Sequence, residues 1–168
     1  MGIFLFYASH MWTDFFIAAA SASAALAGLV FVALSVNITH ILRFPHLPSR
    51  AAATIGSLIL ILVASMAALV HQPVQALGIE ILIFGLCASW LQFVSARLGF
   101  AVSPLRRPVR ELVLNAVLGA VQVIPFILAG VLLVADHLSG LYVVAAGCIA
   151  TLIFSVLNAW VLLVEILR

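Results

Sequence analysis

Five long apolar stretches fill this chain, and its arginines occur only in alternate gaps between them and at the C-terminus. A helix that crosses the ~30 Å hydrocarbon core of a bilayer needs about 20 mostly apolar residues. The segments that meet this requirement are Phe15 to Thr39, Ala51 to Val70, Gln75 to Ala96, Leu112 to Ala135 and Leu141 to Val164. They cover 115 of the 168 residues, and none of the segments outside them is longer than 15 residues, so no soluble domain is left over. We therefore predict one integral membrane domain, residues 1–168, with an all-α fold that is a five-helix transmembrane bundle.

The composition excludes a water-soluble globular protein, since 67% of the residues are apolar and only 7% are charged. No nucleophile motif, phosphate-binding loop or dinucleotide fingerprint is present. Cys87 and Cys148 lie inside predicted spans, without the spacing of metal ligands or redox pairs. We accordingly expect no enzyme activity, no cofactor, no metal site and no nucleic-acid partner.

The arginines predict how the chain is oriented. All seven basic residues are arginines, and they lie at positions 43, 50, 97, 106, 107, 110 and 168. Short loops near span ends carry excess Lys and Arg on the cytoplasmic side of a membrane. The linkers at His40 to Arg50 and Arg97 to Glu111, together with the C-terminus, are therefore expected to be cytoplasmic, and the N-terminus is expected outside.

The first span is unusually rich in small residues between Ala18 and Gly28. Helix contacts in lipid favour small side chains because these let two backbones approach closely. Ser21, Ala24 and Gly28 are the candidate packing residues, and we predict the first span as the central helix of the bundle. The pattern leaves open whether these residues pack within one chain or between chains of a homo-oligomer.

Polar residues recur at helical spacing in the other spans. Residues 151, 155, 158 and 165 share one face of the last span, and residues 111, 115 and 122 share one face of the fourth. With two residues from the first span, the candidate set is Ser35, Asn37, Glu111, Asn115, Gln122, Thr151, Ser155, Asn158 and Glu165. These side chains either hold the helices together through hydrogen bonds or line a cytoplasm-facing cavity.

Three segments resemble a family of small bacterial multi-span inner-membrane proteins that has no established activity. The segments are Trp12 with Phe15 and Phe16, the run Ala24 to Asn37, and the ending Leu157 to Arg168. The resemblance covers the chain from about Met11 to its end. It implies a multi-pass protein of the bacterial cytoplasmic membrane and implies no mechanism.

Two kinds of function are compatible with these features. One is an interaction or accessory component of the membrane, and its expected partners are the lipid bilayer and either a second copy of the chain or another membrane protein. The alternative is an oligomeric channel or transporter for an ion or small solute. A hydrated polar face would favour the alternative, and a dry, packed one would favour the accessory component.

Overall fold

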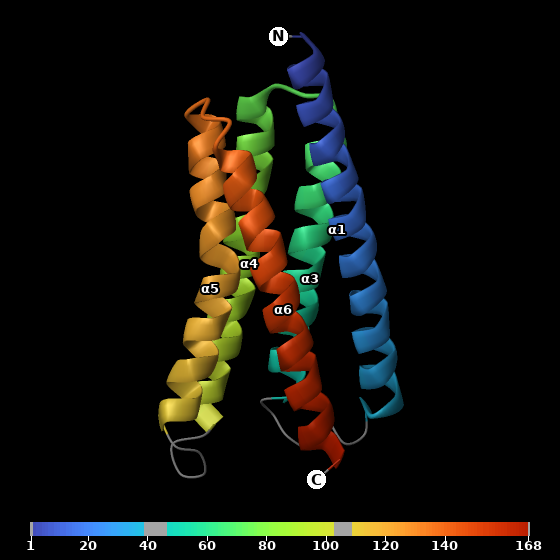
Figure 1. The fold of residues 1–168 in the computed structure, drawn as a ribbon. Coiled ribbons are helices and arrows are strands. Elements are labelled where there is room, and N and C mark those ends of the chain that lie inside the picture. The colour runs from blue at the N-terminus through green and yellow to red at the C-terminus, as the bar shows by residue number, and fades with distance from the viewer. Residues whose placement is uncertain (1, 39–46, 103–108, 168) are drawn as a thin grey trace.

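A computed structural model describes residues 2–38, 47–102 and 109–167, and these residues form long helices (Figure 1). Their bounds are α1 Gly2–Val36, α3 Leu47–Leu69, α4 Val74–Val102, α5 Val109–Val134 and α6 Gly140–Leu167. Each of these five contains a segment long and apolar enough to cross a membrane. The prediction of an all-α fold with five such helices is therefore confirmed for the described part of the chain.

The helices run alternately up and down, so that the chain's two ends lie at opposite ends of the bundle (Figure 1). Helix α3 contacts α1, α4 and α6, while α5 packs between α4 and α6. The short turns between α3 and α4 and between α5 and α6 lie at the same end as the start of α1 (Figure 1). Arg50, Arg97 and Arg110 all belong to the half of the bundle that includes the end of α6.

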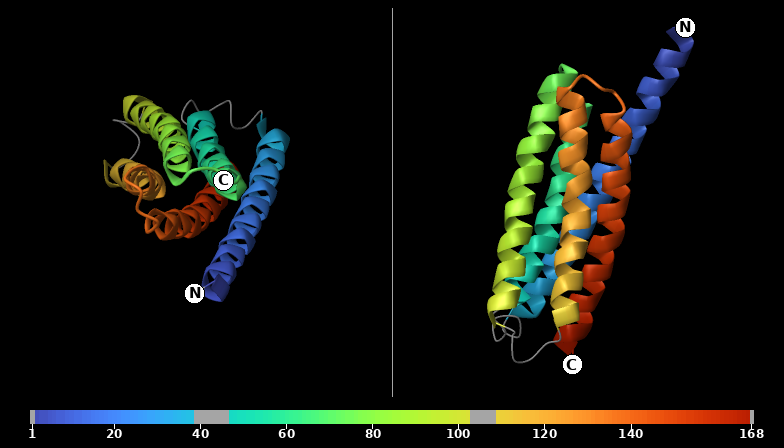
Figure 2. Two further views of the ribbon diagram at one scale, coloured as in Figure 1. Left: turned by 90° about the horizontal axis from the view of Figure 1, so that it is seen from above. Right: turned by 90° about the vertical axis from the view of Figure 1, so that its left-hand side faces the viewer.

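The central helix is α3, so the prediction that the first span occupies that position is wrong for the single chain. Half of the most apolar window of α3 is buried, against 22% for α1. Helix α1 leans against one side of the bundle, and its N-terminal part diverges from the other helices (Figure 2). Small residues favour close packing, but they do not specify which neighbour a helix packs against.

The helices extend beyond the predicted spans. Helix α1 begins at Gly2 rather than near Phe15, and α4 continues past Ala96 to Val102. An apolar window measures the hydrocarbon core, whereas a helix can continue into the interface with polar side chains directed outward. Arg97 illustrates this, because its guanidinium group lies 4.6 Å from the centre of the Phe93 ring on the same helix. Thr39, the predicted end of the first span, lies outside the described residues.

A left-handed residue ends α5 and begins the turn into α6. Asp136 has a φ of 62°, a conformation that Asp tolerates better than most residues. The amide of His137 donates to the carbonyl of Leu132 at 2.9 Å, and that of Asp136 donates to Leu133 at 3.0 Å. This pair of bonds is the Schellman pattern of helix ends. It satisfies carbonyls at the end of α5 and directs the chain back along the bundle as α6.

Helices α4 and α5 approach closely where Gly78 and Gly130 face each other. A Cβ atom built on Gly78 would lie 2.6 Å from the backbone nitrogen of Val134 and 3.0 Å from the carbonyl oxygen of Gly130. The end of the bundle that contains the start of α1 is called the outer end below, and the opposite end the inner end. Near the glycine contact, the core toward the outer end includes the fully buried side chains of Ile81, Leu133 and Val144.

Candidate functional site: a buried polar track

The polar face predicted for the last span is directed into the bundle. Thr151 and Ser155 are buried, with at most 1% of their surface exposed, and Asn158 is half-buried. Successive steps of four and three residues keep these side chains on one face of α6. That face meets α3 and α5, both of which contribute polar groups opposite it.

At the inner end, Asn158 is bound by an arginine from another helix. The Nη2 atom of Arg50 donates to the Oδ1 atom of Asn158 across 3.4 Å. Thr54, one turn further along α3, donates its hydroxyl to the carbonyl of Arg50 at 3.1 Å. The sequence suggested only a topological role for Arg50, but its position also links the start of α3 to α6.

One level deeper, an amide joins α4 to α3. The Nε2 atom of Gln92 donates to the hydroxyl of Ser57 at 2.8 Å, and that hydroxyl donates to the carbonyl of Ala53 at 3.0 Å. Gly119 of α5 provides the space for the amide, because a Cβ atom there would lie 2.8 Å from Oε1 of Gln92. Such interhelical hydrogen bonds contribute roughly 0.6 kcal/mol each in membrane proteins.

A second glutamine, Gln122 of α5, is fully buried without a partner for its side chain. Neither its Oε1 nor its Nε2 atom makes a hydrogen bond. Its backbone carbonyl is engaged, accepting a hydrogen bond of 2.9 Å from Thr151 of α6. The hydroxyls of Ser65 and Ser155 are likewise buried and unpartnered. The thiol of Cys148, a weak donor, lies close to Ser65.

These contacts arrange the polar groups as consecutive levels between α3, α5 and α6, with α4 joining at one level. From the inner end, the pairs are Arg50 with Asn158, Ser57 with Gln92, Gln122 with Thr151, and Ser65 with Cys148. Ser155 lies between Asn158 and Thr151 on α6. We call this set the interior polar track. From Asn158 to Cys148 it extends ten residues along α6, about 15 Å at the rise of an α-helix. Beyond its outer end lie fully buried apolar side chains, among them Val144, which is one turn outward from Cys148 on α6.

The structure brings together only part of the predicted polar set. Gln122, Thr151, Ser155 and Asn158 belong to the track. Ser35 and Asn37 instead bond to carbonyls of their own helix, those of Phe31 at 2.9 Å and Ala33 at 3.0 Å. The side chains of Glu111, Asn115 and Glu165 lie outside the described part of the structure.

Ser21, Ala24 and Gly28 lie on the exposed side of α1. The hydroxyl of Ser21 donates to the carbonyl of Ile17 at 2.8 Å, and nothing approaches within 4 Å of a Cβ atom built on Gly28. The opposite side of α1 packs against the bundle through Phe16, Ala19 and Ser23. Ser21, Ala24 and Gly28 therefore make no packing contact within the single chain that would require their small size.

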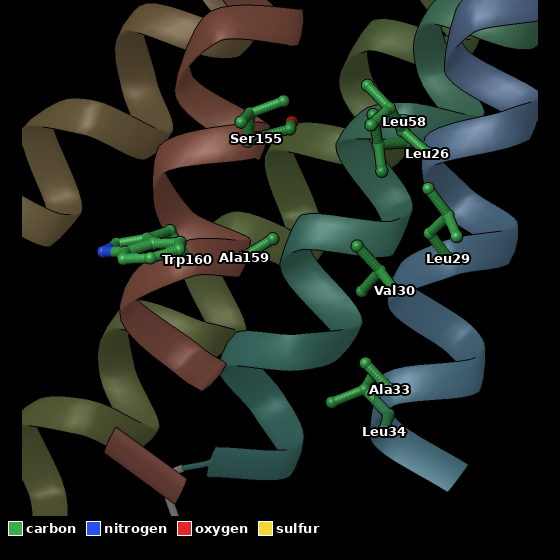
Figure 3. A pocket seen from close by; sticks show the side chains of 10 residues that line it. Leu26, Leu29, Val30, Ala33, Leu34, Leu58, Ser155, Ala159 and Trp160 are labelled. Carbon is green, nitrogen blue, oxygen red and sulfur yellow. The ribbon is translucent and has the colours of Figure 1, made fainter. Parts of the chain in front are cut away.

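An apolar groove of about 210 Å³ separates the inner half of α1 from α6 (Figure 3). Trp12 of α1 and Tyr142 of α6 meet thirteen residues along α6 from Ser155, about 20 Å farther toward the outer end, with ring centroids 4.8 Å apart in an edge-to-face arrangement. Leu58 of α3 contributes to the groove, and Ser155 extends from α6 in the direction of α3 (Figure 3). The remaining lining residues are Leu26, Leu29, Val30, Ala33, Leu34, Val156, Ala159 and Trp160. Ser155 thus belongs both to the groove lining and to the interior polar track.

The track residues that sequence reasoning missed are Arg50, Ser57, Ser65 and Gln92. A signal was present on α3, where positions 50, 54 and 57 follow one helical face. Gln92 carried a weaker signal, being an isolated amide within an apolar span. Among the side chains that the structure describes, no group of three His, Cys, Asp or Glu residues is placed to hold a metal ion.

Comparisons with known proteins add no relative: no family model matches the chain, and no match was found among curated proteins or solved structures.

Proposed function

We propose that the chain is a non-enzymatic, multi-pass protein of the bacterial cytoplasmic membrane that acts as an accessory component by associating with a second copy of itself. The observation that carries this proposal is the outward direction of the small residues of α1. Lipid gives no hydrophobic drive for helix association, so close backbone approach and the resulting dispersion contacts become the main attraction. A helix that faced only lipid would have no use for a stripe of Ser, Ala and Gly.

We expect the chain to self-associate, and substitutions in α1 test this expectation. Gly28→Leu and Ala24→Leu place bulk where a second helix backbone would approach, so both substitutions are expected to shift a stable oligomer to a monomer. The measurement is the protein mass in detergent, from size-exclusion chromatography with light scattering. Ala120→Leu provides a matched control, because Ala120 is an exposed alanine on α5, away from α1. It is expected to leave the mass unchanged.

Two results would count against the self-association proposal. The first is a monomeric wild-type protein. In that case the partner of α1 would be a different membrane protein. The second is wild-type mass in both Gly28→Leu and Ala24→Leu. In that case the small residues face lipid, and the proposed role of α1 fails.

The interior polar track supports a second candidate function, an oligomeric channel or transporter for an ion or small solute. Polar groups deep in a membrane bundle commonly mark solute pathways. If the track opens to the cytoplasm, cysteines introduced at Thr151 and Asn158 in a background without Cys87 and Cys148 will be labelled quickly by a membrane-impermeant thiol reagent from the cytoplasmic side. Protection of both positions, together with reduced thermal stability of Asn158→Leu, would assign the track to helix cohesion.

A further inference from the structure

We infer that the interior polar track holds internal water, bound between α3, α5 and α6 by Gln122, Ser65 and Ser155. This inference is independent of what associates with α1. It concerns a binding site inside one chain, and the ligand class is a small neutral molecule that both donates and accepts hydrogen bonds.

The first support is the unpartnered amide of Gln122. A glutamine side chain offers two donor hydrogens and a carbonyl oxygen with two lone pairs, and none of these has a protein partner here. Burial of a polar group without a hydrogen bond costs a few kcal/mol in an apolar medium. Buried polar groups in native proteins are therefore nearly always bonded to protein or to ordered water. Water is therefore the partner that we assign to the donor hydrogens and the carbonyl oxygen of the Gln122 side chain.

The second support is that Ser65 and Ser155 behave differently from other hydroxyls of the chain. Thr54 and Ser57 donate to the carbonyl four residues earlier in α3, and Ser21 does the same in α1. That local bond is the usual way for a helix to satisfy a hydroxyl in lipid. Ser65 and Ser155 are buried yet do not use it. The Ser155 hydroxyl is thus available to a ligand at the centre of the bundle, while the Ser65 hydroxyl lies beside the Cys148 thiol, a weak hydrogen-bonding group.

The third support is the position of Gln122, Ser155 and Ser65 along the bundle. Gln122 is fixed beside Thr151 by the 2.9 Å hydrogen bond to its carbonyl. Ser155 lies one turn from Thr151 toward the inner end, and Ser65 lies beside Cys148, one turn toward the outer end. Cys148 and Ser155 are seven residues apart on α6, about 10 Å. One water molecule makes roughly three hydrogen bonds, so a short chain of waters can connect these groups.

The surroundings favour water over an ion. No Asp, Glu, Lys or Arg side chain in the described part of the structure makes a hydrogen bond with the side chain of Ser155, Gln122 or Ser65. An ion there would lack the opposite charge that buried charges require. Fully buried apolar side chains lie on its outer side, with Val144 one turn outward from Cys148, while Arg50 and Asn158 lie on its inner side.

Radiolytic labelling tests this inference with the two native cysteines as sensors. The full chain in lipid nanodiscs is exposed to brief X-ray pulses in ¹⁸O-labelled water without dissolved oxygen, and water-derived oxygen on each cysteine is measured by mass spectrometry. Cys148 is buried beside Ser65, whereas Cys87 is exposed at the middle of α4, where it faces lipid. We expect Cys148 to be labelled several-fold faster than Cys87, although it is the more buried thiol.

A pair of matched substitutions assigns the water to Gln122. Gln122→Met removes the unpartnered amide and is expected to lower the labelling rate of Cys148 several-fold. Gln92→Met makes the same chemical change at an amide that is already bonded to Ser57, so the Cys148 rate should stay near wild type. If Gln122→Met is not recovered folded, Ser65→Ala replaces it, with the same decrease expected. Labelling of Cys148 no faster than Cys87, or an unchanged rate in the folded variant, would overturn the inference.

Discussion

Replacement of Gly78 by leucine is expected to prevent the chain from folding into a monodisperse bundle. The Cβ atom alone would lie 2.6 Å from the Val134 nitrogen and 3.0 Å from the Gly130 oxygen, and both are backbone atoms. A flexible side chain can rotate away from such a contact, but a helix backbone has to move as a whole. Extra methylene groups in a packed core cost about 1–3 kcal/mol, and a leucine that separates α4 from α5 should cost more. The measurement is size-exclusion yield together with thermal unfolding in detergent.

Gly28→Leu is the control for this prediction, because it makes the same substitution where the single chain leaves open space. It is expected to retain the helical content and fold of the wild type, even where it changes the oligomeric mass. A Gly78→Leu protein that elutes and unfolds like the wild type would contradict the close approach of α4 and α5.

The sequence predicts the number and class of helices well because their cause is local. Each span needs only enough consecutive apolar residues to cross the hydrocarbon core, and this property is readable without knowing any neighbour. The arrangement of the helices relative to one another is harder to predict. In lipid, an exposed face and a packed face can both be apolar. The spans of α1 and α3 therefore have nearly the same mean hydropathy, although α3 is central and α1 is peripheral.

In the candidate site, too, the sequence predicted local features and did not predict contacts between helices. The polar face of α6 was predicted because Thr151, Ser155 and Asn158 recur at helical spacing within an apolar span. Their partners on other helices were not predicted, since contacts such as Arg50 with Asn158 depend on how far one helix is shifted along another. Helical periodicity predicts the face of the helix on which a residue lies, but it carries no information about how far one helix is shifted along its neighbour.

Reporter fusions should give an all-or-none answer on the orientation of the bundle. The turns that contain Pro73 and His137 lie at one end, together with the start of α1, while Arg50 and Arg97 belong to the opposite half (Figure 1). Arginine-rich loops stay on the cytoplasmic side of the membrane. A reporter enzyme that is active only outside the cytoplasm should therefore give activity when fused at Pro73 or His137, and none at Ser49 or Ser103.

A second reporter, fluorescent only in the cytoplasm, controls for expression and should show the reverse pattern at the same four positions. Activity of the first reporter at Ser49 and Ser103 would reverse the orientation. It would also place the Arg50–Asn158 end of the interior polar track outside the cell, so that any solute or reagent entering at that end would come from the external side. The orientation thus decides which aqueous compartment lies next to the inner end of the track.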